Sequence, residues 1–235
     1  MASLRAIYPE VDLTRVRIVL VEMTDHVLGP FAPRLRKYTA KQLRERGVEL
    51  RLGVAVKEVH DDCVVLSDRE RLPSAATIWA TGVKVDDQIA GWGLPQGRGG
   101  RIEVEPDMRV VGHPEIFAVG DVAASVDGPL PQLAQPAIQG GRHAAAQIGR
   151  LIAGKPTQPM VYKDKGTMAT IGRSAAVVQL PRGLKLTGRI AWLAWLALHI
   201  AMLLGYRNRL ATLANLSVHY LAWPGRLNII VGDPP

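Results

Sequence analysis

Two short stretches of the sequence place polar residues where a ligand could be held. The apolar run IFAVGDVAA, residues 116–124, ends abruptly in Gly120 and Asp121. Glycine lets the backbone approach a bound group closely, and an aspartate directly after a buried strand is costly unless something accepts its charge or its hydrogen bonds. Asp121 is therefore a candidate ligand-binding residue. A turn or N-cap aspartate is the structural alternative.

The second stretch, AQPAIQGG at 134–141, is predicted to open a helix over 137–154, with Pro136 suited to its start and Gly154 to its end. Backbone N–H groups at a helix start carry partial positive charge, so those of Ala137 and Ile138 could stabilise an anionic group. Gln135 and Gln139 lie four residues apart and share one face if the helix includes both. Polar residues facing water are the alternative, in particular for Gln139.

Two further strand ends carry residues that could contact a ligand. The segment VRIVLVE, 16–22, is predicted to be a buried strand that ends in Glu22. A dinucleotide-binding fold places an acid there for the ribose hydroxyls, although a solvated strand end is the alternative. The segment TIWATG, 77–82, is predicted to be an apolar strand that closes on Ala80, Thr81 and Gly82. Open α/β sheets bind ligands at such strand ends.

The elements that must position these residues alternate between strands and helices, which indicates an α/β fold. A helix is expected from about Pro33 to just before Gly47. The other strands are expected at 48–52, 56–60, 63–67, 101–104, 108–111 and 116–119, with a further pair within 168–180. Residues 82 to about 100 are rich in glycine and are expected to form a loop.

The C-terminal part of the chain differs in kind. Residues 190–206 are apolar at nearly every position except His199, which predicts a helix without a polar face. Its 17 residues are at the short limit for a membrane span. A second helix is expected over 209–223. The two helices could pack on each other, lie in a membrane interface, or do both.

The net charge of +8 is unevenly distributed. Residues 1–149 hold 18 Lys and Arg against 19 Asp and Glu, whereas residues 150–235 hold 11 basic residues and 2 acidic ones. Basic residues beside apolar, Trp-containing segments favour a membrane surface over a nucleic acid, and no nucleic-acid-binding module is visible. The single Cys63 excludes an internal disulfide framework. The six histidines lack ligand spacing, so no metal site is predicted.

The order of these features resembles that of a known superfamily. An acidic strand end, ATG, a strand ending in GD and AQPAIQGG at a helix start are similar to the flavoproteins with two dinucleotide-binding domains. More narrowly, PQLAQPAIQGGRHAA, YKDKGTMATIGRSAAVV and LTGRIAWLAWLALHIAMLLGYRNRL resemble type II NADH:quinone oxidoreductases over almost the entire chain. The resemblance implies a partial Rossmann-like FAD/NAD(P) fold with an apolar helical membrane-association region. It implies a partial NADH-binding domain at 1–82, the C-terminal part of an FAD-binding domain at 83–180 and a helical tail at 181–235.

The function implied by this resemblance is electron transfer from NADH through FAD to a membrane quinone, without proton pumping. The protein would sit peripherally on the cytoplasmic face of the membrane, and a homodimer is left open. The implied cofactor-binding residues are Glu22, Ala80, Thr81, Gly82, Gly120, Asp121, Ala137 and Ile138, and the implied catalytic residues are Gln135 and Gln139. Among these, Asp121 would hold the ribityl and phosphate region of FAD, and the two glutamines would lie near the isoalloxazine ring and the quinone.

One departure from the family is an absence. Neither of its glycine-rich phosphate loops is found in the sequence, so the chain is expected to be N-terminally truncated or to have a misassigned start. It is also expected to bind FAD poorly and to have little activity by itself. Two alternatives remain: another quinone-linked flavoprotein such as a sulfide:quinone reductase, which would need more cysteines than Cys63, or an inactive membrane-binding remnant.

Overall fold

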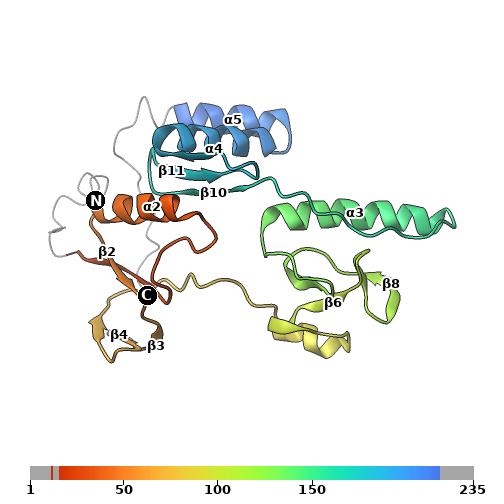
Figure 1. Cartoon of the computed structure of the whole chain (residues 1–235), viewed down its shortest axis with the longest axis horizontal. Helices are drawn as coiled ribbons and strands as arrows, with labels where there is room; N and C mark the ends of the chain where they lie inside the picture. The colour runs from red at the N-terminus through yellow and green to blue at the C-terminus, as the bar shows by residue number, and fades with distance from the viewer. Residues whose placement is uncertain (1–11, 13–15, 218–235) are drawn as a thin grey trace, which may run out of the picture. The chain divides into compact units, whose positions relative to one another are not determined.

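The computed structural model describes Asp12 and residues 16–217, which form two compact units (Figure 1). Unit 1 combines the residues before Ile78 with those from Gly166 onward, and unit 2 consists of Ile78–Lys165. Each unit has its own buried core. The division into domains at 82 and 180 stays a prediction.

Unit 1 opens with a strand, helix and strand whose existence was predicted from the sequence. β1 (Ile18–Glu22) and β2 (Val48–Leu52) pair in parallel, and α2 (Pro33–Glu45) connects them. Parallel neighbours require such a crossover. Helix α2 has proline in its first turn, where a missing N–H costs nothing, and it ends just before Gly47, whose φ is +82°.

A three-stranded antiparallel sheet packs beside this pair. Its strands are β3 (Val56–Val59), β4 (Cys63–Leu66) and β5 (Arg71–Pro73). The first two were predicted, and the third was not. Buried Val64, Leu66 and Leu72 contact Val19 and Val21 of β1, which joins the two sheets through one apolar cluster.

The second half of unit 1 contains a sheet that lies between α2 and the first C-terminal helix, α4 (Figure 1). β10 (Thr167–Thr170), β11 (Ala176–Gln179) and β12 (Lys185–Thr187) are antiparallel, and α4 (Gly188–Met202) and α5 (Tyr206–Ser217) follow. Successive side chains of a strand point to opposite faces. Val177 of β11 therefore packs against Leu35 of α2, whereas Ala176 and Val178 pack against Ala191 of α4.

The two C-terminal helices agree in type with the sequence prediction, although each begins a few residues earlier. Residues 218–223 of the second predicted helix lie outside the described part. Among the helices of the described residues, none combines the length and the hydropathy needed to cross a membrane.

Unit 2 contains a four-stranded sheet in the order β8-β7-β6-β9. The strands are β6 (Ile102–Val104), β7 (Arg109–Val110), β8 (His113–Phe117) and β9 (Ala123–Ser125), and only the pairing of β6 with β9 is parallel. Short 3-10 turns at Asp87–Trp92, Arg98–Gly100 and Gly120–Val122 fill the connections. The long helix α3 (Ala134–Ile152) follows the sheet.

Two strand predictions were wrong, one because the strand is absent and the other because the strand lies a few residues earlier. Residues 77–82 form no strand, and Ile78 and Trp79 are 91% and 62% exposed. An apolar run becomes a strand only beside a partner that takes its backbone hydrogen bonds, and no described strand pairs with this segment. The strand predicted at 116–119 lies at His113–Phe117 instead, because its ladder partner Arg109–Val110 pairs with those residues.

Candidate functional site

Gly120 brings the chain after β8 directly against the start of α3. Its φ is +77°, a conformation that favours glycine, and a Cβ there would lie 3.4 Å from the Cβ of Ala137. Gly140 makes a similar approach from the helix, since a Cβ there would lie 3.5 Å from the Cβ of Val119. The two glycines therefore hold the Gly120–Asp121 turn against the first turns of the helix.

Asp121 projects its carboxylate from this turn without an internal partner. The residue is exposed, and within 16–217 its side chain makes neither a hydrogen bond nor an ion pair. Its backbone oxygen accepts a hydrogen bond from the Gln132 side chain at 3.2 Å. The turn is thus fixed through the backbone, which leaves the carboxylate available to a ligand.

Helix α3 begins at Ala134, three residues before the predicted start. Alanine and glutamine favour helix, and Pro136 is tolerated because it stands in the first turn. The Ala137 N–H consequently donates to the Leu133 oxygen at 3.3 Å. No side chain caps the helix, so the amides left without a helical partner are those of Ala134 and Gln135. Ile138, whose amide was expected to be free, lies one residue further into the helix.

The two candidate catalytic glutamines do lie together. Gln139 Nε2 is 3.5 Å from Gln135 Oε1. Gln139 is otherwise occupied, because its Nε2 donates to the Lys163 oxygen and its Oε1 accepts from the Lys163 N–H, both at 3.0 Å. Gln135 has only the long contact to Gln139 among the described residues. Gln135 is therefore the freer of the two side chains.

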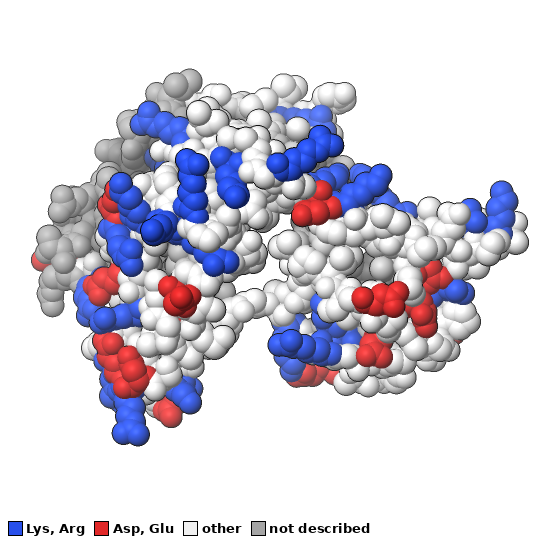
Figure 2. All heavy atoms as spheres, in the orientation of Figure 1, with Lys and Arg blue, Asp and Glu red and all other residues white. Residues whose placement is uncertain are grey.

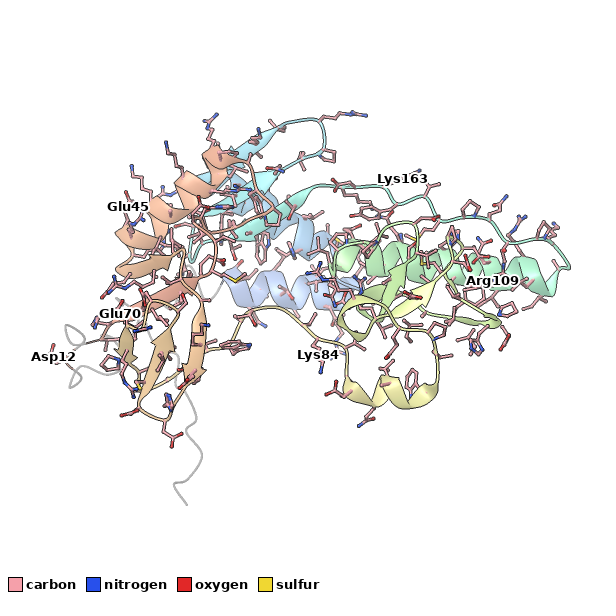
Figure 3. All side chains as sticks on the ribbon, turned by 60° about the horizontal axis from the view of Figure 1, so that its bottom comes forward. Asp12, Glu45, Glu70, Lys84, Arg109 and Lys163 are labelled. Atoms are coloured by element: carbon pink, nitrogen blue, oxygen red, sulfur yellow. The ribbon has the colours of Figure 1, made fainter. Side chains whose placement is uncertain are left out.

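Residues 155–165, here called the strap, run back along α3 after the chain turns at Gly154 (Figures 1 and 3). Figure 3 labels Lys163 near its end. This element has no apolar periodicity, so it was not predicted from the sequence. The feature of the sequence that could have indicated the strap is a row of polar side chains on one face of the helix, formed by Gln139, His143, Gln147 and Arg150.

Asp107 fixes the strap near its start, at Thr157. Its carboxylate accepts from Thr157 Oγ1 at 2.6 Å and from Arg109 Nε at 2.7 Å, beside a cavity of about 500 Å³ that Gln158 also lines. Burial alone would raise the pKa of Asp107. The hydrogen bonds from Thr157 and from the backbone and side chain of Arg109, together with the charge of Arg109, outweigh it and hold the pKa below its ordinary value.

The remaining candidate residues lie apart from this turn in the sequence. Glu22 ends β1 as predicted, at the carboxyl end of a parallel pair. Its Oε1 accepts from the Thr24 N–H at 2.8 Å and from Thr24 Oγ1 at 3.0 Å, so one carboxylate oxygen closes the following turn. Ala80, Thr81 and Gly82 are exposed and belong to no strand. Where they would touch a cofactor stays a prediction.

The surface of α4 and α5 is apolar and is bordered by basic residues. Ile190, Leu193, Tyr206 and Leu210 are exposed by 70%, 57%, 82% and 67%. Residues 166–217 contain six Lys and Arg and no Asp or Glu. Figure 2 shows basic side chains gathered over the part of unit 1 that holds α2 and these helices. Such a surface suits an anionic, apolar partner.

Comparisons with known proteins agree with this geometry. Residues 10–141 match the pyridine nucleotide-disulphide oxidoreductase family, and residues 165–223 match the NDH2 C-terminal domain. The chain is 35% identical to the type II NADH:quinone oxidoreductase Ndh of Mycobacterium tuberculosis, over 94% of this chain and 49% of that protein. It is 34% identical to the mitochondrial internal alternative NAD(P)H-ubiquinone oxidoreductase A1 of Arabidopsis thaliana, over 83% and 42% of the two chains.

A solved structure has the same fold. NDH2 of Plasmodium falciparum in complex with NADH superposes with a TM-score of 0.81 and 18% identity, over 91% of this chain and 59% of that one. The chain spans about half the length of the curated relatives it matches.

The chain belongs to the pyridine nucleotide-disulphide oxidoreductase family. The match of its C-terminal part and the relatives that align along most of its length place it, within that family, with the type II NADH:quinone oxidoreductases. The family resemblance seen in the sequence is thereby confirmed.

Proposed function

We propose that this chain carries part of the machinery of a flavin-dependent enzyme that passes electrons from NADH through FAD to a membrane quinone without pumping protons. The observation that carries the proposal is the Gly120–Asp121 turn on the start of α3. There an exposed carboxylate and two helix-start amides have no partner within the described residues.

This turn fits FAD by its chemistry. Gly120 leaves no side chain between the turn and the helix, so a ligand can approach the backbone. Asp121 would accept hydrogen bonds from hydroxyl groups of the ribityl chain. The amides of Ala134 and Gln135, rather than the Ala137 and Ile138 amides first expected, would favour negative charge on a bound ring. When bound, FAD supplies a two-electron carrier that takes hydride from NADH and reduces quinone.

Glu22 is proposed to bind NADH through the ribose hydroxyls of its adenosine. One of its oxygens accepts from Thr24, and the other makes no contact within the described residues. An acid at this strand end also repels a 2′-phosphate, which favours NADH over NADPH. Ala80, Thr81 and Gly82 are proposed to border the bound cofactor.

Gln135 and Gln139 are proposed to lie at the quinone end of the site. Gln135 can offer both a donor and an acceptor to a quinone oxygen or to the flavin edge, since its only internal contact is 3.5 Å long. Neither glutamine titrates near neutral pH. Their part is therefore to orient the reactants rather than to exchange protons.

Docking on the cytoplasmic face of the membrane is proposed to bring the site to its quinone. Exposed Ile190, Leu193 and Leu210 would enter the apolar boundary of the bilayer, and the basic residues around them would meet lipid phosphates. The surface requires no membrane-spanning helix. A homodimer is compatible with this arrangement.

The protein purified with excess FAD tests the proposal. Because the chain alone is expected to bind FAD poorly, we expect weak flavin absorbance that grows with FAD concentration, slow bleaching by NADH and recovery of the colour when a soluble quinone is added. Asp121→Ala should weaken FAD binding about 10-fold or more, because a charge-assisted hydrogen bond is removed. Folded protein that takes up no FAD would instead favour a membrane-binding remnant. Flavin that NADH reduces but quinone does not reoxidise would refute the quinone assignment.

A further inference from the structure

The strap is held on α3 by side chains. The strap has neither helix nor strand, and from Pro156 onward each hydrogen bond found between it and α3 comes from a helix side chain. Apart from the N–H groups of Lys155 and Met160, which donate to the backbone oxygens of Arg150 and Pro106, the strap's hydrogen-bonded backbone groups have these side chains as partners.

Four side chains form this attachment, and they lie on one face of the helix. Arg150 Nε donates to the Pro156 oxygen at 2.7 Å, and His143 Nε2 lies 2.9 Å from the Gln158 oxygen. Gln147, only 3% exposed, accepts from the Gln158 N–H at 2.8 Å. Gln139 completes the series with its two bonds to Lys163. Spacings of four, four and three residues repeat with the helix period, so the face runs the length of α3.

Gln139 has little capacity left for a ligand. Its oxygen and one of its N–H groups are engaged with the backbone of Lys163. Its other N–H has only the long contact to Gln135 Oε1. A carboxamide has two donors and one acceptor atom, so a quinone oxygen would have to displace one of these bonds.

We propose that Gln139 is a positioning residue that fixes the end of the strap and the orientation of Gln135, rather than a group that binds quinone. It clamps Lys163 through both backbone groups, and its remaining N–H faces Gln135 Oε1 at 3.5 Å, which orients that side chain without engaging it fully. Gln135 is then the side chain that meets the quinone. The link to quinone rests on the proposed function, whereas the clamp itself rests only on the contacts within unit 2.

Hydrogen exchange of the Lys163 amide tests the clamp in the purified chain, without cofactor. In Gln139→Ala this amide loses its acceptor, and its exchange should rise about 2- to 10-fold. Gln135→Ala is the matched control on the same helix turn and should leave the exchange of Lys163 unchanged. Gln139→Glu keeps an oxygen for the Lys163 N–H and should restore slow exchange. Unchanged exchange in Gln139→Ala would overturn the proposal.

Kinetics of the FAD-loaded protein test the consequence. Gln135→Ala should raise the KM for a soluble quinone, and Gln139→Ala should raise it as well, with partial rescue in Gln139→Glu. If Gln139→Ala raises the KM while the exchange of Lys163 stays slow, Gln139 binds quinone directly and the proposal is wrong. If exchange rises and the KM does not, the clamp has no bearing on quinone, which also overturns it. A parent protein without quinone activity would refute the proposed function, and the exchange experiment would still decide the clamp.

Discussion

Replacing Gly166 with alanine should cost far more stability than replacing Gly183, although both glycines have a φ of +88°. Both belong to the β10–β12 sheet region, Gly166 just before β10 and Gly183 in the turn before β12. A Cβ on Gly166 would lie 2.4 Å from the Gln179 oxygen and 3.0 Å from the Leu180 Cα, both backbone atoms. A Cβ on Gly183 would meet nothing within 4 Å.

The two variants share one cost and differ in another. Alanine at this φ costs about 1 kcal/mol at either position. Overpacking adds about 1–3 kcal/mol where the neighbours must move, and backbone atoms of a strand yield less readily than side chains. We therefore expect Gly183→Ala to lose about 1 kcal/mol of the free energy of unfolding, and Gly166→Ala to lose about 2–4 kcal/mol.

Hydrogen exchange over peptides of β10 and β11 gives the appropriate readout, because it reports on this sheet alone. Circular dichroism at low temperature checks that both variants are folded. Losses that agree to within about 0.5 kcal/mol would refute the reasoning, since the contact at Gln179 would then contribute nothing beyond the shared backbone strain.

Two further predictions concern Asp107 and the apolar helices. Asp107→Asn should lower the free energy of unfolding by about 1–3 kcal/mol at about pH 7. Because the folded-state pKa lies below the ordinary value of 3.8, the carboxylate stabilises the fold above that pH and stops doing so as the pH falls through the folded-state pKa. Urea unfolding at neutral and acidic pH should show that the difference in the free energy of unfolding between the parent protein and Asp107→Asn becomes smaller in acid. A difference that does not change with pH would contradict the stabilising role of the Asp107 carboxylate. In a vesicle assay with anionic lipid, Leu193→Glu and Leu210→Glu should each weaken binding about 10-fold, whereas Ile152→Glu, at a residue 85% exposed on α3, should not. Equal effects of all three would show that α4 and α5 are not the docking surface.

Local signals in the sequence predicted most elements of unit 1 and the turn of the candidate site. Pro33 and Gly47 marked the ends of α2, and the apolar run before Gly120 located the turn. The start of α3 was placed too late because the helix was begun only after Pro136, whereas proline is tolerated throughout the first turn. The strand at 77–82 was predicted from its apolar composition alone. A strand also needs a neighbouring strand that accepts and donates its backbone hydrogen bonds.

The strap could not be predicted because its order comes from distant side chains. Pro156 and Pro159 disfavour a helix in residues 156–163 but do not place the segment, and Gln139, His143 and Gln147 supply partners from up to 24 positions earlier in the sequence. The spacing of those side chains was visible, but a polar helix face usually points to water. The occupied state of Gln139 followed only from the structure.

The position of β11 between α2 and α4 limits how a variant without the proposed docking surface could be engineered. Deleting the chain from Gly188 onward would remove Ala191 and uncover Ala176 and Val178, which are fully or almost fully buried. The same strand supports Leu35 through Val177 on its other side, so the damage would reach the helix between β1 and β2. Replacing exposed leucines such as Leu193 and Leu210 with polar residues would keep the packing of β11 against α2 and α4 intact. It is therefore the better way to reduce the apolar surface.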